Sequence, residues 1–197
     1  INEEINEEIN LTDLYYTIQS EEDLSHEEVI LEMHSILFDE NNISKSSYPG
    51  GVNEEEFWII VLNLWPWEYN KAKNVKDAAV EKTTLYYGDN SWRDDGDAFR
   101  HTYFAALLSL EFGGTFAKNL TDAHESLAEP GLDKDMYLHN NARGIALYAI
   151  WKENYKVGND NLWNQLAEYI THAVRFRQFY NIIKLNDVQN PQFKVLT

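Results

Sequence analysis

The chain has 197 residues, of which 44% are hydrophobic and 14% aromatic, a composition typical of a globular protein with one well-buried domain. It has no cysteine, which excludes disulfides, thiolate zinc sites and cysteine nucleophiles. The net charge is −17, with neither a basic stripe nor an apolar run of about 18 residues, so we expect no nucleic-acid binding and no membrane-spanning helix.

The acidic side chains are concentrated at the N-terminus, where the first 40 residues hold 13 Asp and Glu and no Lys or Arg. Isoleucines four residues apart open this segment, and Ser25 with Glu28 predicts a capping box for a second helix. Residues 41–53, rich in Asn, Ser, Gly and Pro, predict a linker. We therefore predict that residues 1–40 form an acidic helical arm or hairpin, packed on the body or on a protein partner.

Residues 54–197 are predicted to form a helical domain. The spacing of apolar residues, caps such as Asn53 with Glu56, and stops at glycine or proline divide it into elements. The expected helices cover residues 57–64, 66–88, 97–112, 115–127, 133–155 and 162–183, followed by an extended tail. Since no convincing strand pattern appears, we predict an all-α fold of roughly seven to eight helices, orthogonal or bundle-like.

Three polar clusters interrupt the apolar helical sequence between Asp97 and Gly144. They are Asp97–His101 (DAFRH), Thr121–Glu125 (TDAHE) and His139–Asn141 (HNN). Burying such groups costs free energy unless each finds a partner, and helices that only pack rarely repeat the pattern three times. The clusters therefore indicate a functional site.

In the first cluster, Asp97 and His101 are four residues apart and share a helix face, with Arg100 at its edge. An aspartate at this spacing can fix the tautomer of a histidine and raise its basicity. The alternative is that Asp97 caps the helix and His101 is a hydrogen-bonded core histidine.

In the second cluster, the apolar stripe of the helix predicts that His124 points inward and that Asp122 and Glu125 point away from the core. These two acids would then be ordinary solvated charges. The alternative is that the helix is sandwiched, so that both acids face a second buried surface.

The third cluster lies on a helix in which Asp135 and His139 share a face with two alanines. Small side chains let another helix approach closely, so this pattern predicts that His139 lies at a helix crossing. Tyr137 lies on the opposite face. Asn140 and Asn141 are poor helix formers, which favours a role in hydrogen bonding across the bundle or in ligand binding.

Two chemical models fit these clusters. In the first, a divalent transition metal such as zinc is held by imidazoles and a carboxylate. The candidate ligands are His101, His124, His139, Asp122 and Asp135, with Glu125 as a further carboxylate. In the second, no metal is used: His101 or His124 paired with a carboxylate, Asp97 or Glu125, acts as general base or acid, and Arg100 steadies an anionic oxygen.

The clusters resemble the pattern of a bacterial family of uncharacterised domains, often C-terminal in secreted, wall-associated or toxin-like proteins. That pattern is DAFRHxY, TDAHE and MDLHNNxxG; this chain has DAFRHTY at Asp97–Tyr103, TDAHE at Thr121–Glu125 and MYLHNNARG at Met136–Gly144. The resemblance covers about residues 65–150 and implies a bacterial protein, exported or at the cell surface after signal removal, without an established activity. Tyr137 stands where the pattern has an acid, which leaves open whether the site is active.

Our leading hypothesis is a hydrolase of phosphodiester or other ester bonds, with His101, His124 and His139 near one cleft that takes a small ester substrate. The competing hypothesis is a non-catalytic interaction domain, in which the clusters form a buried polar network that fixes helix packing. In that case the acidic arm would dock a protein partner.

Overall fold

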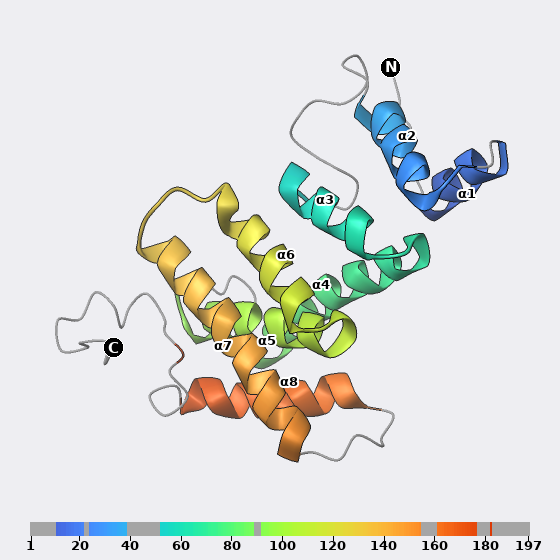
Figure 1. The fold of residues 1–197 in the computed structure, drawn as a ribbon. Helices are drawn as coiled ribbons and strands as arrows, with labels where there is room; N and C mark the ends of the chain where they lie inside the picture. The colour runs from blue at the N-terminus through green and yellow to red at the C-terminus, as the bar shows by residue number, and fades with distance from the viewer. Residues whose placement is uncertain are drawn as a thin grey trace, which may run out of the picture. The chain divides into compact units, whose positions relative to one another are not determined.

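The computed structural model describes residues 11–21, 24–38, 52–88, 92–154, 161–176 and 182. Their regular structure consists of eight α-helices, which confirms the predicted all-α fold (Figure 1). The helices are α1 (Leu11–Glu21), α2 (His26–Phe38), α3 (Glu54–Asn63), α4 (Pro66–Tyr87), α5 (Asp95–Phe112), α6 (Gly114–Ser126), α7 (Leu132–Asn154) and α8 (Leu162–Arg175). Of these helices, none is long and apolar enough to cross a membrane.

The chain divides by its internal contacts into two compact units, residues 1–73 and 74–197, and α4 runs across the division. Of the predicted linker, only Val52 and Asn53 belong to the described residues, so a boundary in that segment stays a prediction. The N-terminal isoleucine repeat and the predicted C-terminal tail, residues 184–197, also lie outside the described residues.

In the first unit, α1, α2 and α3 share an apolar core. Tyr15, Val29, Met33 and Phe57 are nearly inaccessible to solvent and belong to one cluster. Both predicted capping boxes form: the backbone N–H of Glu28 donates to Ser25 Oγ and that of Ser25 to Glu28 Oε2, and Asn53 and Glu56 exchange the equivalent pair.

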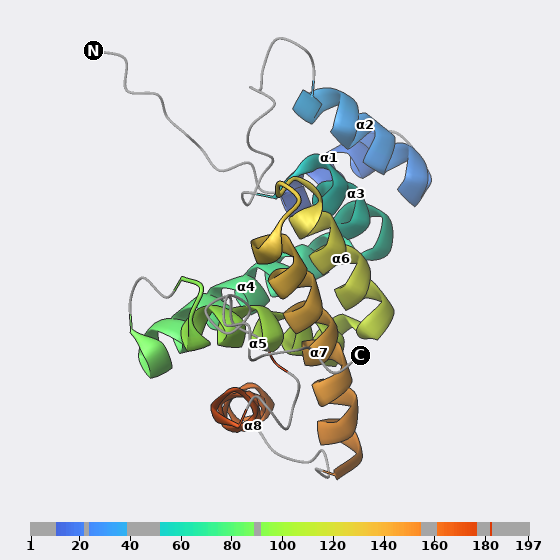
Figure 2. The same ribbon diagram turned by 90° about the vertical axis from the view of Figure 1, so that its left-hand side faces the viewer.

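The second unit is organised around α5, which packs against α6, α7 and α8. Figures 1 and 2 show α6 and α7 running side by side, while α8 crosses α7 instead of following it. Most of α5 is buried from Gly96 to Ser109, as expected for a helix that is apolar on nearly all sides. A buried helix that also carries Asp97 and His101 must supply them with partners from its neighbours.

The close approach of α7 to α5 depends on Gly144. A Cβ added there would lie 2.1 Å from the backbone oxygen of Thr102 on α5, so only glycine fits. The alanine face predicted to make this crossing does not do so, since Ala142 is exposed. The crossing uses the opposite face of α7, because the absence of any side chain at Gly144 permits a closer approach than alanine does.

Most helix ends lie within three residues of the sequence prediction, and the start of α5 matters most for the site. Helix α5 begins at Asp95, and its N-cap is Asp94, whose side chain accepts from the N–H groups of Gly96 and Asp97 at 3.0 Å. Asp97 is therefore inside the first turn and is not a cap. Helix α8 ends at Arg175 with Phe176 as C-cap, earlier than the predicted end at residue 183.

Candidate functional site

Residues of the first two clusters and of α7, the helix that carries the third cluster, meet around the imidazole of His101, which is 9% exposed. Its Nδ1 lies 3.5 Å from Oε1 of Glu125 on α6, and its Nε2 lies 3.7 Å from Oδ1 of Asp97 on α5. Tyr137 on α7 stacks on the ring, with the centroids 4.2 Å apart and the planes 12° from parallel. Each ring nitrogen of the buried His101 therefore faces a carboxylate: Nδ1 faces Glu125 on α6, and Nε2 faces Asp97 on α5, the helix of His101 itself.

Asp97 is fully buried and is held by two donors besides its contact with His101. The backbone N–H of Arg93 donates to Oδ2 at 2.9 Å, and the guanidinium of Arg100 donates to Oδ1. Burial raises the pKa of Asp97, while the Arg93 hydrogen bond and the Arg100 charge act in the opposite direction. Arg100 is itself about one-third exposed, so it links the buried carboxylate to the solvent.

Burial, with smaller contributions from the nearby Arg100 and His124 side chains, lowers the pKa of His101 to about 3, although a hydrogen bond with Asn141 opposes the shift. The ring is therefore neutral near pH 7. A neutral imidazole has one N–H donor and one nitrogen that can accept a proton.

Tyr137 is partly buried, and burial together with the negative charges of Asp97 and Asp133 raises its pKa to about 12. Its hydroxyl therefore stays protonated at ordinary pH. The position at which this chain departs from the resembled pattern thus belongs to the site itself, because its ring covers His101.

Of the two orientations left open for α6, the sandwiched helix is correct for Glu125, whereas Asp122 lies on the surface and the prediction that His124 points inward is wrong. Glu125 is 4% exposed and points to His101, whereas His124 is exposed. The reason is that α6 packs against both α5 and α7, so the helix has a second buried face, which the single apolar stripe did not reveal.

The structure does not bring the proposed metal ligands together. Asp122 is paired with Lys118 on the surface, Asp135 is exposed and His139 is half-buried. Among the described residues, which include all six candidate ligands, no three His, Asp or Glu side chains are placed to hold a metal ion. Asn140 and Asn141 are both buried, and the side chain of Asn141 hydrogen-bonds to His101.

Sequence reasoning missed Arg93 and Asp133, which close one side of the site. The Arg93 guanidinium lies over the ring of Trp92, and its Nε donates to Asp133 Oδ1 at 2.8 Å. Arg93 also has a φ of 59°, a left-handed conformation uncommon for a residue other than glycine. Residues in a loop have no helical periodicity, and a contact made by a backbone N–H cannot be recognised from the sequence. The only available signal was the loop before α5, which is rich in asparagine and aspartate.

Together these groups can exchange protons and hold an anion.

The comparisons with known proteins identify the family. Residues 59–174, more than half of the chain, match a domain of unknown function (DUF6973), and the chain belongs to this family. The match confirms the expected uncharacterised domain family and extends it into α8; the resembled motif pattern, bacterial origin and export stay predictions. No curated protein and no solved structure matches the chain.

Proposed function

We propose that this member of the DUF6973 family is a hydrolase of phosphodiester or other ester bonds in which His101 is the acid–base group. The observation that carries the proposal is the placement of a buried, neutral imidazole between two carboxylates, at 3.5 Å from Glu125 and 3.7 Å from Asp97. Both separations exceed a direct hydrogen bond of about 2.7–3.2 Å. Catalytic hydrogen bonds are often long without substrate and shorten when it binds.

In the proposed reaction, His101 accepts a proton from a water molecule as that water attacks the phosphorus or carbonyl carbon of the ester. The bond to the leaving oxygen then breaks, and the protonated His101 returns its proton to that oxygen. Glu125 faces Nδ1, which keeps its N–H throughout, and Asp97 lies 3.7 Å from Nε2, the nitrogen that takes and returns the proton. The two negative charges stabilise the transient imidazolium. No net proton or electron is gained by the protein.

Arg100 gives the site a means of recognising an anionic substrate. Its charge lowers the pKa of His101, and its guanidinium is about one-third exposed. An anionic ester oxygen bound to Arg100 would offset that charge, and the pKa of His101 would rise. Substrate binding would thus make His101 a better base, which favours a phosphodiester over a neutral ester.

The proposal is the metal-free version of the chemistry. Within the described part of the chain, no three His, Asp or Glu side chains are placed to hold a metal ion, and the proposal uses proton transfer between His101 and its neighbours. Tyr137 holds the ring flat against α7 and keeps its orientation. The hydrogen bond from the Arg93 backbone positions the Asp97 carboxylate, and the bond from the Arg93 side chain to Asp133 positions the N-terminal end of α7.

The test is hydrolysis of bis(p-nitrophenyl) phosphate and p-nitrophenyl acetate by the full chain. His101→Gln should lower kcat/KM by about 100-fold or more, since general acid–base catalysis contributes roughly 10²–10⁴-fold. Arg100→Gln should raise KM more for the anionic phosphodiester than for the neutral acetate.

The matched control is Glu129→Gln, which removes an exposed carboxylate just beyond α6 and should leave both rates unchanged. Thermal unfolding of each variant separates loss of activity from loss of fold. Absence of turnover by the wild-type chain, or equal turnover by His101→Gln, would contradict the proposal.

A second candidate function is a non-catalytic interaction domain stabilised by a buried polar network. The observation that favours it is burial: Asp97, His101, Glu125 and Asn141 are each 9% exposed or less. Buried polar networks can specify helix packing. On this hypothesis the same variants lower stability without any hydrolysis to lose, and residues 1–40 dock a protein partner.

A further inference from the structure

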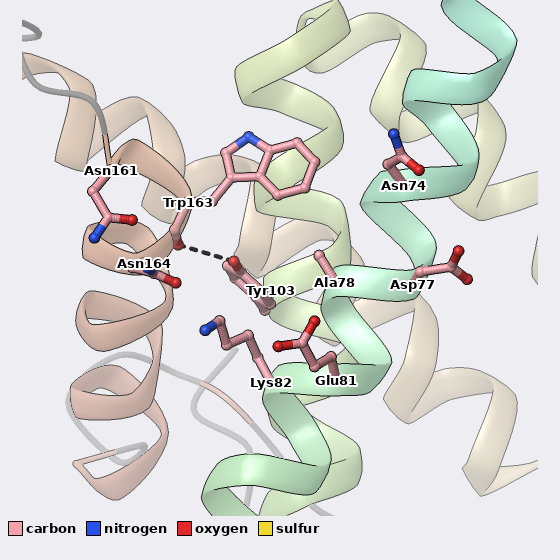
Figure 3. A pocket seen from close by; sticks show the side chains of 9 residues that line it. All are labelled: Asn74, Asp77, Ala78, Glu81, Lys82, Tyr103, Asn161, Trp163 and Asn164. Atoms are coloured by element: carbon pink, nitrogen blue, oxygen red, sulfur yellow. Dashed lines mark hydrogen bonds between the residues drawn. The ribbon is translucent and has the colours of Figure 1, made fainter.

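A cavity of about 460 Å³ lies between α4, α5 and the start of α8, away from the His101 cluster (Figure 3). Its volume falls within the roughly 300–1,000 Å³ typical of small-molecule sites. Tyr103, which lines it, is two residues after His101, so the two side chains leave α5 on opposite sides, about 200° apart. The cavity is therefore independent of the proposed hydrolase site.

The aromatic wall of the cavity is fixed in place. Tyr103 is fully buried, and its hydroxyl donates to the backbone oxygen of Trp163 at 2.9 Å (Figure 3). The indole Nε1 of Trp163 donates to Glu111 Oε1 at 2.6 Å. The first bond fixes the backbone of Trp163 and the second orients its indole before any ligand binds, which reduces the entropy that binding must overcome.

Polar side chains from two helices border this wall. On α4 the cavity is lined by Asn74, Asp77, Glu81 and Lys82, of which Glu81 and Lys82 point toward Tyr103 while Asp77 points away from Trp163 (Figure 3). Asn161 is the N-cap of α8 and Asn164 lies in its first turn. In the described part of the chain, no hydrogen bond or ion pair engages these six side chains, and Asn161 makes no capping bond at the helix it precedes. Their donors and acceptors are available to a ligand.

The chemistry of this set selects a ligand rich in hydroxyl groups. An amide offers both donors and acceptors, a carboxylate accepts and an ammonium donates, so all three can bond a hydroxyl, which is itself donor and acceptor. Asp77 and Glu81 disfavour an anion, and the Lys82 ammonium partly offsets their attraction for a cation. The flat apolar face of a sugar ring can pack against the indole face of Trp163.

We propose that this cavity binds a neutral saccharide, with the sugar ring against Trp163 and its hydroxyls bonded to the amides of Asn161 and Asn164 and to the α4 side chains.

The test is NMR titration of the full chain with methyl β-glucoside, N-acetylglucosamine and maltose. The reporter is the indole N–H signal of Trp163, identified as the signal that Trp163→Phe lacks. At least one saccharide should shift this signal saturably at millimolar concentration. The double variant Asn161→Ala/Asn164→Ala should raise the Kd about tenfold, the effect of losing about 1.4 kcal/mol of binding free energy.

The matched control, Asn119→Ala, removes an exposed asparagine from α6 and should bind as the wild type does, as should His101→Gln. A saccharide that binds the double variant with unchanged affinity would place the site elsewhere and overturn the proposal. A shift caused by spermidine or inorganic phosphate but by no saccharide, or no shift at all, would overturn it too.

Discussion

The polar groups next to the two sides of α5 differ in their exposure to solvent and in their partners. On the His101 side, Asp97, His101 and Glu125 are almost excluded from water and face one another. On the Tyr103 side, the polar groups of α4 and α8 border an open cavity, and no partner in the described chain engages them. The difference shows that burial, and not residue type, decides whether a polar group needs a partner in the folded state. Substitutions on the first side should therefore change stability, and those on the second should change only ligand binding.

The largest effect is expected for Asp97→Ala. This change leaves His101 and Arg100 without a buried carboxylate. Breaking a buried ion pair costs about 3–5 kcal/mol, and the lower end is expected here because Arg100 is one-third exposed and solvent screens its charge. The measurement is the free energy of unfolding from urea denaturation.

Two variants provide the comparison for Asp97→Ala. Asp122→Ala breaks an exposed pair with Lys118 and should cost no more than about 1 kcal/mol. Asn164→Ala, on the Tyr103 side, should change stability by less than about 0.5 kcal/mol. If all three cost the same, the two sides of α5 do not differ energetically.

A somewhat smaller loss is expected for Gly144→Ala, because its methyl group would meet the Thr102 backbone oxygen, which cannot move without shifting α5. Overpacking of this kind typically costs about 1–3 kcal/mol and here should reach the upper end. Gly131→Ala is the control, since a Cβ there meets nothing within 4 Å. An unfolding free energy for Gly144→Ala equal to that of Gly131→Ala would show that the two helices do not need this close approach.

The smallest effect for each measured step is the pH dependence of stability that arises from His101, because its contribution is spread over several pH units. Its pKa is about 3 when folded and about 6.5 when unfolded, so the unfolded chain binds more protons between these values. Stability should therefore be complete above pH 6.5 and fall as the pH decreases, by up to about 1.4 kcal/mol per pH unit. The raised pKa of Asp97 acts in the opposite direction, because its contribution is lost as the pH rises.

The difference between the wild type and His101→Gln isolates this histidine, because Asp97 is present in both. Urea denaturation at several pH values between 4 and 7 gives the slopes. A variant with the same slope as the wild type would mean that His101 titrates in the folded chain as it does when unfolded.

Much of the site could be predicted from the sequence where helical spacing alone decides the geometry. Asp97 and His101 are four residues apart on one helix, so their shared face followed directly, and Arg100 was correctly placed beside them. The position of Glu125 was left open and His124 was placed wrongly, because the partner surfaces of α6 depend on how α5 and α7 pack around it. Arg93 was missed because its contact with Asp97 is made by a backbone N–H.

The sequence by itself determined the all-α class, the capping boxes at Ser25 and Asn53, and the segment that carries the polar clusters. These depend on interactions between residues within a few positions of one another, which a local pattern records. Only the tertiary structure decided that Gly144 makes the helix crossing, that Glu125 and not His124 faces His101, and that Trp163 and Tyr103 line a second cavity. Each of these contacts joins residues far apart in the chain, and their distance depends on how whole helices pack.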